Sequence, residues 1–123
     1  MPTLTIVVRN CRSDKGSLVC GAYTQDAFKR FGEGSPVARE RVPAQQGEVA
    51  IRLDVPEGRY AAAVYHDTND NGRLDLTFVG TPAEPRGYSN ITDVRLAPPS
   101  FDEAAVEVGP DGASADARLR YPG

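Results

Sequence analysis

The residues with the clearest potential for chemistry form a polar stretch near the middle of the chain. Residues 66–75 read His-Asp-Thr-Asn-Asp-Asn-Gly-Arg-Leu-Asp, with oxygen-bearing side chains at alternate positions and a glycine at 72. Calcium loops have this spacing, because the cation binds roughly six to eight oxygen atoms and the glycine permits a sharp turn. The predicted ligands are the side chains of Asp67, Asn69, Asn71 and Asp75, the carbonyl of Arg73 and the carboxylate of Glu84.

The match to a calcium loop is incomplete at its end. The twelfth position is Phe78, where an EF-hand has a bidentate glutamate, and Glu84 substitutes for it only if the following segment folds back. Strands are predicted on both sides, so an EF-hand helix pair is not expected. We therefore predict a weak Ca²⁺ site, near the millimolar range of extracellular modules. The alternative is a metal-free hydrogen-bonded turn, since Asn71-Gly72 is a strong hairpin signal.

A second polar segment follows the first. Residues 80–90 combine two prolines, two glycines, both signs of charge, an aromatic residue and an amide. Beside the 67–75 loop this segment is predicted to form a polar cleft suited to a sugar, a peptide or a small anion. The alternative is an ordered loop whose polar groups satisfy one another, with prolines that restrict the unfolded chain. The predicted ligand-binding residues are His66, Arg86, Tyr88 and Asn90, with Asp67 and Glu84 also lining the cleft.

His66 is the only histidine and is the candidate for a catalytic residue. Its side chain has an ordinary pKa near neutrality, and at a strand end beside Asp67 it could act as a general base. The structural alternative, which we favour, is a histidine hydrogen-bonded under the loop. The sequence contains no nucleophile elbow, phosphate-binding loop or zinc-protease motif, so an enzyme is not the favoured interpretation.

The two cysteines lie at positions 11 and 20, on either side of a turn signal at residues 14–17. Counting outward from that turn places Cys11 opposite Cys20 at a non-hydrogen-bonded position of a hairpin, where α-carbons approach to about 4.5 Å. This register predicts a disulfide, which would imply an oxidising compartment. The alternative is two free thiols on adjacent strands.

Frequent prolines and glycines favour an all-β fold, because they leave little room for a long helix. Alternating apolar residues at 49–55 indicate a half-buried strand, and the turn at 56–58 predicts a hairpin with the next strand. A single helical turn capped by Asp26 is predicted at 26–31. Together they favour one antiparallel β-sandwich spanning residues 1–123, with about seven to nine short strands. The expected strands are 3–10, 17–24, 37–42, 48–55, 59–66, 74–79, 93–96, 104–108 and 115–121.

Composition excludes several classes of function. The formal net charge of -3 and the scattered basic residues argue against nucleic-acid binding, and Arg39–Arg41 is interpreted as a solvated strand face. No segment reaches the ~20 apolar residues of a membrane-spanning helix. No signal peptide is visible at the start of the chain, so either the protein stays in the cytoplasm or an export signal has been removed.

The central motifs resemble those of DUF2141, a family of bacterial proteins. The resemblance rests on residues 58–61, 65–75 and 78–90, and on Pro99-Ser100-Phe101-Asp102-Glu103-Ala104, which matches a later Pro-x-Phe segment. It implies a single-domain, usually exported protein with a transthyretin-like, immunoglobulin-like or related β-sandwich and no assigned activity. It therefore favours a periplasmic or secreted location.

Three classes of function remain open: a calcium-stabilised module that binds a protein, peptide or carbohydrate, a metal-free structural interaction domain of the cell envelope, and a small hydrolase using His66. The spacing of the 67–75 loop favours the first. An exposed apolar sheet or pairing edge would favour the second, and an exposed His66 with a perturbed pKa the third.

Overall fold

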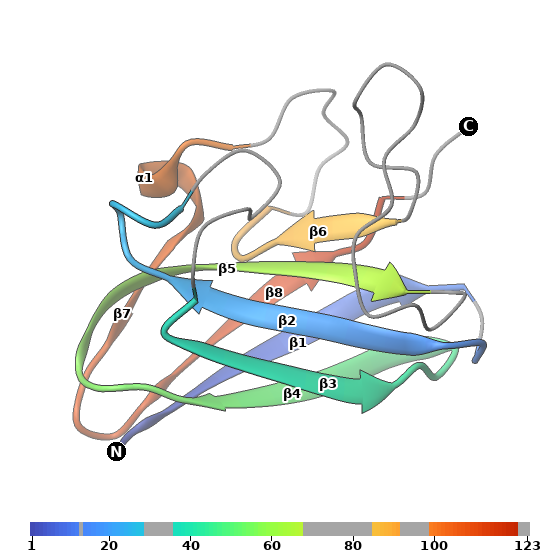
Figure 1. The fold of residues 1–123 in the computed structure, drawn as a ribbon, viewed down its shortest axis with the longest axis horizontal. Coiled ribbons are helices and arrows are strands. Elements are labelled where there is room, and N and C mark those ends of the chain that lie inside the picture. Colours follow the sequence, from blue (N-terminus) through green and yellow to red (C-terminus); the bar gives the residue numbers. More distant parts are fainter. Residues whose placement is uncertain (13, 29–35, 68–84, 92–98, 121–123) are drawn as a thin grey trace.

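The computed structural model describes residues 1–12, 14–28, 36–67, 85–91 and 99–120. These residues form two packed β-sheets with one short helix (Figure 1). The elements in chain order are β1 (Thr3–Cys11), β2 (Ser17–Tyr23), β3 (Ala38–Pro43), β4 (Gly47–Asp54), β5 (Gly58–Asp67), β6 (Arg86–Tyr88), α1 (Phe101–Ala104), β7 (Ala105–Val108) and β8 (Ala113–Arg118). The all-β sandwich predicted from the sequence is confirmed.

The smaller sheet, here sheet A, has the order β4-β1-β8. β1 pairs antiparallel with β4 and parallel with β8. The larger sheet, sheet B, has the order β3-β2-β5-β6, and β7 also pairs with β5. All pairs in sheet B are antiparallel. The long strand β5 therefore organises sheet B, and β1 organises sheet A.

The core lies between the sheets and is built by side-chain alternation. A β-strand presents successive side chains to opposite faces, so every second residue of β1 and β4 turns inward. Most inward residues of these two strands are fully buried or nearly so, among them Leu4, Ile6, Val8, Ile51 and Leu53. Sheet B contributes Leu18, Cys20, Ala22, Tyr60, Ala62 and Val64 to the same cluster.

The two sheets meet along one side, where β6 lies against the end of β8. The backbone amide of Arg120 donates to the carbonyl of Arg86 at 2.8 Å, and the amide of Arg86 donates back at 3.3 Å. Gly87 makes this approach sterically feasible, because a Cβ atom there would lie 2.6 Å from the carbonyl oxygen of Arg118. The sandwich is thus closed by main-chain hydrogen bonds on the β6–β8 side.

Two predicted hairpins are wrong. β1 and β2 lie in different sheets, as do β4 and β5, although short connections join both pairs of strands at the expected positions. A period-two pattern identifies one buried face of a strand, and that face exists whether the next strand joins the same sheet or crosses to the other. Strand positions could therefore be predicted, but strand partners could not.

Smaller differences concern the second half of the chain. β6 lies inside residues 80–90, which were expected to be a loop, and α1 occupies the start of the segment before β7. At the expected helical turn, the amides of Ala27 and Phe28 donate to the carbonyl of Thr24, while residues 29–31 lie outside the described residues. The expected strands at 74–79 and 93–96 also lie outside them.

Candidate functional site

The end of β5 places two consecutive polar side chains on opposite faces of sheet B. His66 follows Val64 on the inward face, opposite Leu18 of β2, whereas Asp67 follows Tyr65 on the outward face, opposite Ser17. Both residues are fully buried. Burying a carboxylate or an imidazole is costly unless its polar atoms have partners, so both must be held by specific contacts.

His66 is held beneath the turn between β1 and β2. Its Nε2 lies 2.6 Å from the carbonyl oxygen of Lys15, and its backbone amide donates to the carbonyl of Pro85 at 2.8 Å. Because a carbonyl only accepts, Nε2 carries the proton in this contact. The ring therefore ties β5 to the 14–17 turn, which agrees with the structural role favoured for His66.

Asp67 is held by an arginine from an edge strand. The Nη2 atom of Arg41, on β3, lies 3.0 Å from Oδ2 of Asp67. The Arg41 side chain is 38% exposed, while the Asp67 side chain is 0% exposed. Arg41 thus reaches from solvent across β2 to compensate a buried negative charge, and the first predicted ligand of the calcium loop has a fixed position.

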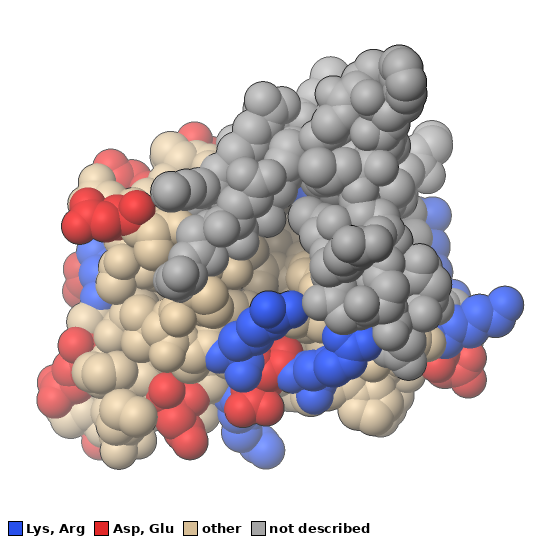
Figure 2. All heavy atoms as spheres, viewed as in Figure 1, with Lys and Arg blue, Asp and Glu red and all other residues tan. Residues whose placement is uncertain are grey.

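A second arginine of β3 also contacts a side chain of β5. Arg39 Nη2 donates to the hydroxyl of Tyr65 at 3.2 Å, and Tyr65 is directly opposite Arg86 of β6. The outward face of sheet B at this end therefore carries arginines on both β3 and β6. In the view of Figure 2, basic and acidic side chains gather over this part of the sheet.

The predicted cleft residues that the structure describes do not converge. His66 faces inward, whereas Arg86 and Tyr88 lie on the outward face, opposite Tyr65 and Ala63. The side-chain amide of Asn90 donates through Nδ2 to the carbonyl of Ala105 at 2.8 Å. These four residues therefore belong to different local environments. Glu84 lies outside the described residues, as do Asn69, Asn71, Arg73 and Asp75.

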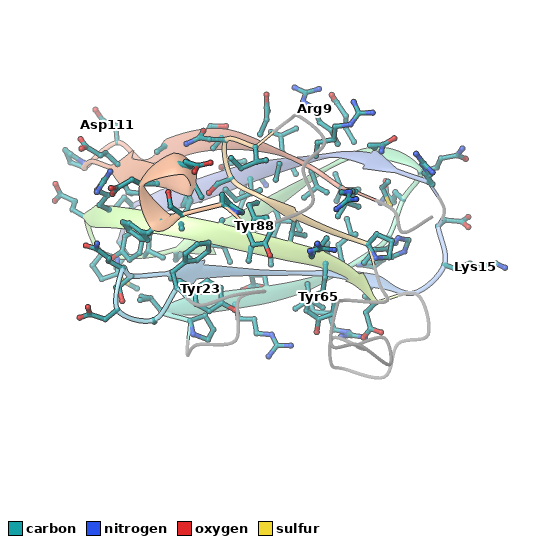
Figure 3. All side chains as sticks on the ribbon, turned by 90° about the horizontal axis from the view of Figure 1, so that it is seen from above. Arg9, Lys15, Tyr23, Tyr65, Tyr88 and Asp111 are labelled. Atoms are coloured by element: carbon teal, nitrogen blue, oxygen red, sulfur yellow. The ribbon has the colours of Figure 1, made fainter. Side chains whose placement is uncertain are left out.

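Tyr88 belongs to an aromatic cluster on the outward face of sheet B. The ring of Phe28 makes edge-to-face contacts with Tyr23, Tyr88 and Phe101, at centroid distances of 6.3, 6.0 and 6.1 Å. Such geometry is favourable for aromatic pairs. Figure 3 shows the sandwich from above, with Tyr23, Tyr65 and Tyr88 along the larger sheet. Phe28, Tyr88 and Phe101 belong to a second, smaller hydrophobic core, so this part of the outward face is packed and is not an open binding face.

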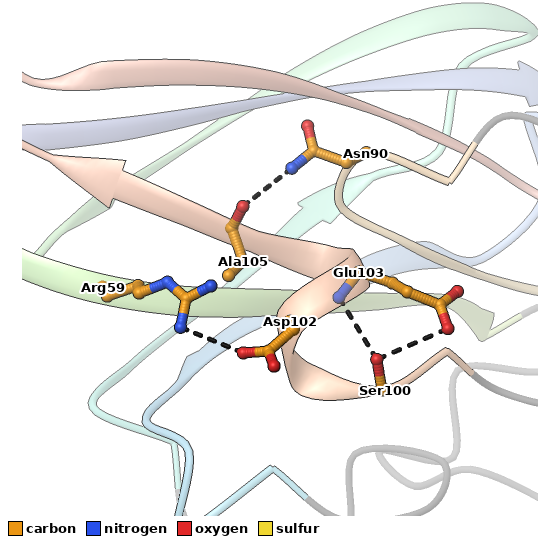
Figure 4. Close-up of polar contacts among 6 residues, drawn as sticks. All are labelled: Arg59, Asn90, Ser100, Asp102, Glu103 and Ala105. Carbon is orange, nitrogen blue, oxygen red and sulfur yellow. Dashed lines mark hydrogen bonds and ion pairs between the residues drawn. The ribbon is translucent and has the colours of Figure 1, made fainter.

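Helix α1 covers this second core and is tied to sheet B by polar contacts (Figure 4). Ser100 caps it by accepting from the amide of Glu103 at 3.3 Å. Asp102 accepts from Arg59 of β5 at 3.0 Å, and the guanidinium of Arg59 lies 5.4 Å from the centroid of Phe101. The Pro-x-Phe segment noted in the sequence thus anchors the helix through its aromatic ring.

The predicted disulfide between Cys11 and Cys20 is wrong. Both cysteines are free and buried, on strands that belong to different sheets. The hairpin register that paired them does not exist, since β2 pairs with β3 and β5. Burial raises the pKa of the Cys20 thiol to about 12. Cys20 is therefore an inert component of the core and gives no information on the redox compartment.

Sequence reasoning missed two polar residues that contact buried groups. Arg41 was interpreted only as part of a solvated face, and Ser89 was not singled out. Ser89 is fully buried, accepts from the amide of Ala62 at 2.9 Å and donates to the carbonyl of Ala104. The alternation of Arg39 and Arg41 does indicate that both side chains lie on one face of β3. It predicts a contact with Asp67 only when the strand order β3-β2-β5 is known.

Among the described residues, no group of three or more His, Cys, Asp or Glu side chains could hold a metal ion. In the same part of the chain, no helix is long and apolar enough to cross a membrane. The calcium prediction depends mainly on residues outside this part and therefore stays a prediction.

Comparison with known proteins assigns the chain to a family. No curated protein and no solved structure matches it significantly. Residues 6–116 match DUF2141, described as an uncharacterized protein conserved in bacteria. The match begins in β1 and ends in β8, so it spans both sheets of the sandwich. The protein belongs to the DUF2141 family.

Proposed function

We propose that this protein is a non-catalytic binding module of the periplasm or the extracellular space, stabilised by a weakly bound Ca²⁺ in the 67–75 segment. It would bind a protein, peptide or carbohydrate. The observation that carries the proposal is Asp67, a fully buried carboxylate fixed at the end of β5, at the first position of the calcium-like spacing.

The surroundings of Asp67 support a weak site over a strong one. Arg41 occupies the Oδ2 atom, and a neighbouring positive charge repels a cation. A first ligand that is already paired with arginine therefore reduces the attraction for Ca²⁺. Binding near the millimolar range is expected, which is useful only where free calcium is abundant.

The proposed extracytoplasmic location rests mainly on the family resemblance. The disulfide argument no longer applies, because Cys11 and Cys20 are free. The millimolar affinity expected of the loop is consistent with a calcium-rich exterior.

The metal-free structural domain of the cell envelope is the second candidate, favoured by the unpaired edge of β4 in the described part of sheet A. The hydrolase alternative has less support. It required an exposed His66, whereas His66 is 0% exposed and its Nε2 contacts the Lys15 carbonyl.

Calcium dependence is tested by thermal unfolding of chelator-treated protein, with millimolar Ca²⁺ or with Mg²⁺ as the ion control. We expect a calcium-selective rise in Tm that is lost in Asp75→Ala and in Asp67→Ala. Asp75→Ala is the cleaner variant, because Asp67→Ala also removes the partner of Arg41.

Asp111→Ala is the matched control, since Asp111 is an exposed aspartate at the end of the sandwich opposite Lys15 (Figure 3). It should retain the full calcium response. An unchanged Tm at saturating Ca²⁺ would remove the metal from the proposal and leave the structural domain as the better candidate.

A further inference from the structure

We propose that β4 is a dimerisation strand, which pairs antiparallel with β4 of a second copy of this chain. In the described part of sheet A, β4 pairs with β1 on one side and forms the end of the strand order. Figure 1 shows β4 along the lower border of the molecule. An edge strand presents unpaired backbone N–H and C=O groups, which can template pairing with another chain.

The edge strand of sheet B is protected against such pairing. In β3, Glu40 is directly opposite the core residue Cys20, so it occupies an inward-facing position. An inward-pointing charge at an edge disfavours addition of a strand. β3 also ends in Pro43, which has no amide hydrogen to donate.

β4 carries neither form of protection. Its strand runs for 8 residues without a proline, and its inward side chains are the apolar Val49, Ile51 and Leu53. Polar side chains are confined to its outward face. β4 thus has the properties of a strand that accepts a neighbour, whereas β3 has those of a strand that excludes one.

The outward side chains of β4 identify a second copy as the partner. The exposed residues of this face are Glu48, Ala50, Arg52 and Asp54. If a two-fold axis passes beside Ala50, Ala50 is opposite Ala50 of the second copy and Glu48 is opposite its Arg52. The two-fold symmetry repeats the Glu48–Arg52 pair, so both pairs unite opposite charges.

An axis beside Leu53 would also oppose unlike charges, Arg52 and Asp54, but it aligns only residues 52–54 of each β4, whereas the Ala50 register aligns residues 47–53. Two other registers are repulsive. An axis beside Ile51 would place Glu48 opposite Asp54, and an axis beside Arg52 would oppose two arginines, and both arrangements are repulsive. The Ala50 register also places Val49 opposite Ile51, which is a favourable pair of β-branched residues. The side chain of Arg52 has no hydrogen bond or ion pair with other described residues, so its guanidinium is available to a partner chain.

The dimer would join the two copies of sheet A into one continuous sheet with the order β8-β1-β4-β4-β1-β8. Glu48 already contacts Arg9 of β1, so in the dimer its carboxylate would lie between two arginines. This arrangement extends sheet A, whereas the described end of β5 belongs to sheet B. The inference is therefore independent of the calcium proposal.

The test is sedimentation velocity on the full chain, from about 1 µM to about 1 mM, with dimer dissociation constants as the readout. We expect wild-type protein to dimerise within this range. Arg52→Glu should raise Kd about tenfold or more, because each cross-strand pair changes from attraction to repulsion. Glu48→Arg should have the same effect. The double variant E48R/R52E should restore Kd to within about threefold of the wild-type value, because the pairs are exchanged rather than lost.

Glu40→Arg on β3 is the matched control and should leave Kd unchanged. Circular dichroism verifies that each variant is folded. The proposal is overturned by a wild-type protein that stays monomeric throughout the range, by single variants that dimerise as the wild type does, or by a double variant that does not regain affinity.

Discussion

The Nη2 atom of Arg41 lies 3.0 Å from Oδ2 of Asp67. The arginine side chain extends from β3 across β2 to reach this carboxylate on β5. The pair joins an exposed cation to a fully buried anion. An exposed ion pair contributes little to stability, but removal of one partner from a buried charge is costly. This contact therefore connects the edge of sheet B to the point where the 67–75 segment begins.

Arg41→Ala should lower the free energy of unfolding by about 1–3 kcal/mol, because it leaves the buried Asp67 carboxylate without its cation. Urea unfolding at neutral pH measures the change. Arg39→Ala is the matched control. It removes an arginine from the same face of β3, but one that donates to the neutral hydroxyl of Tyr65 instead of a buried carboxylate, and should cost less than about 1 kcal/mol. An equal decrease in unfolding free energy for the two variants would show that the contact with Asp67 stabilises the fold no more than the contact with Tyr65.

Gly87→Ala should destabilise the sandwich by about 1–3 kcal/mol. The added methyl group would lie 2.6 Å from the carbonyl oxygen of Arg118, and backbone atoms of β6 or β8 would have to move. Gly109→Ala serves as control, because a Cβ atom there meets nothing within 4 Å. Thermal unfolding compares the two variants, and a Gly87→Ala protein as stable as the control would contradict the close approach of the sheets.

Ser89→Ala should cost about 2–3 kcal/mol, since it leaves the buried amide of Ala62 and carbonyl of Ala104 without the serine hydroxyl. Ser114→Ala removes a hydroxyl from an exposed position of β8 and should be close to neutral. Chemical denaturation gives both values. A small effect of Ser89→Ala would mean that water replaces the hydroxyl.

Stability should fall above about pH 9, and Cys20 should contribute to that fall. Burial raises the pKa of its thiol from 9.0 to about 12, so the neutral thiol is favoured in the folded state. Below pH 9 the thiol is neutral in both states and the full stability is present. Between pH 9 and pH 12 it ionises only when unfolded, and stability is lost by at most about 1.4 kcal/mol per pH unit.

Cys20→Ala should show a shallower decline of unfolding free energy between pH 9 and pH 10, measured by urea titration at each pH. Burial also raises the pKa of Tyr23 above its ordinary value of 10.0, so Tyr23 adds a decline at higher pH, and the comparison is therefore made below pH 10. The two proteins are compared by the slope of unfolding free energy against pH. Their absolute stabilities also differ because the smaller side chain leaves a cavity. Parallel slopes would contradict the assignment to Cys20.

The sequence permits prediction of strands more readily than of their partners. The alternation of Val49, Ile51 and Leu53 predicts β4 correctly because burial of one face is a local property of the strand. The hairpin between Cys11 and Cys20 failed because a turn signal does not distinguish a connection within a sheet from one between sheets. The short strand β6 was missed since its identity depends on β5 and β8, not on its own three residues.

The candidate site was predictable in part for the same reason. The position of Asp67 at a strand end followed from local pattern, and its burial with His66 agrees with the structural role favoured for the histidine. The contact with Arg41 could not be predicted, because those residues lie far apart in the sequence and meet only through the order β3-β2-β5.

The parallel pairing of β1 with β8 has a consequence for the biogenesis of the protein. Leu4 is opposite Ala113, so sheet A needs strands from the two ends of the described sandwich. Such a sheet cannot be completed on the ribosome until β8 has emerged, and contacts of this sequence separation form slowly. The nascent polypeptide should therefore lack its full tertiary structure until β8 has been synthesised, a state in which chaperones can still act on it.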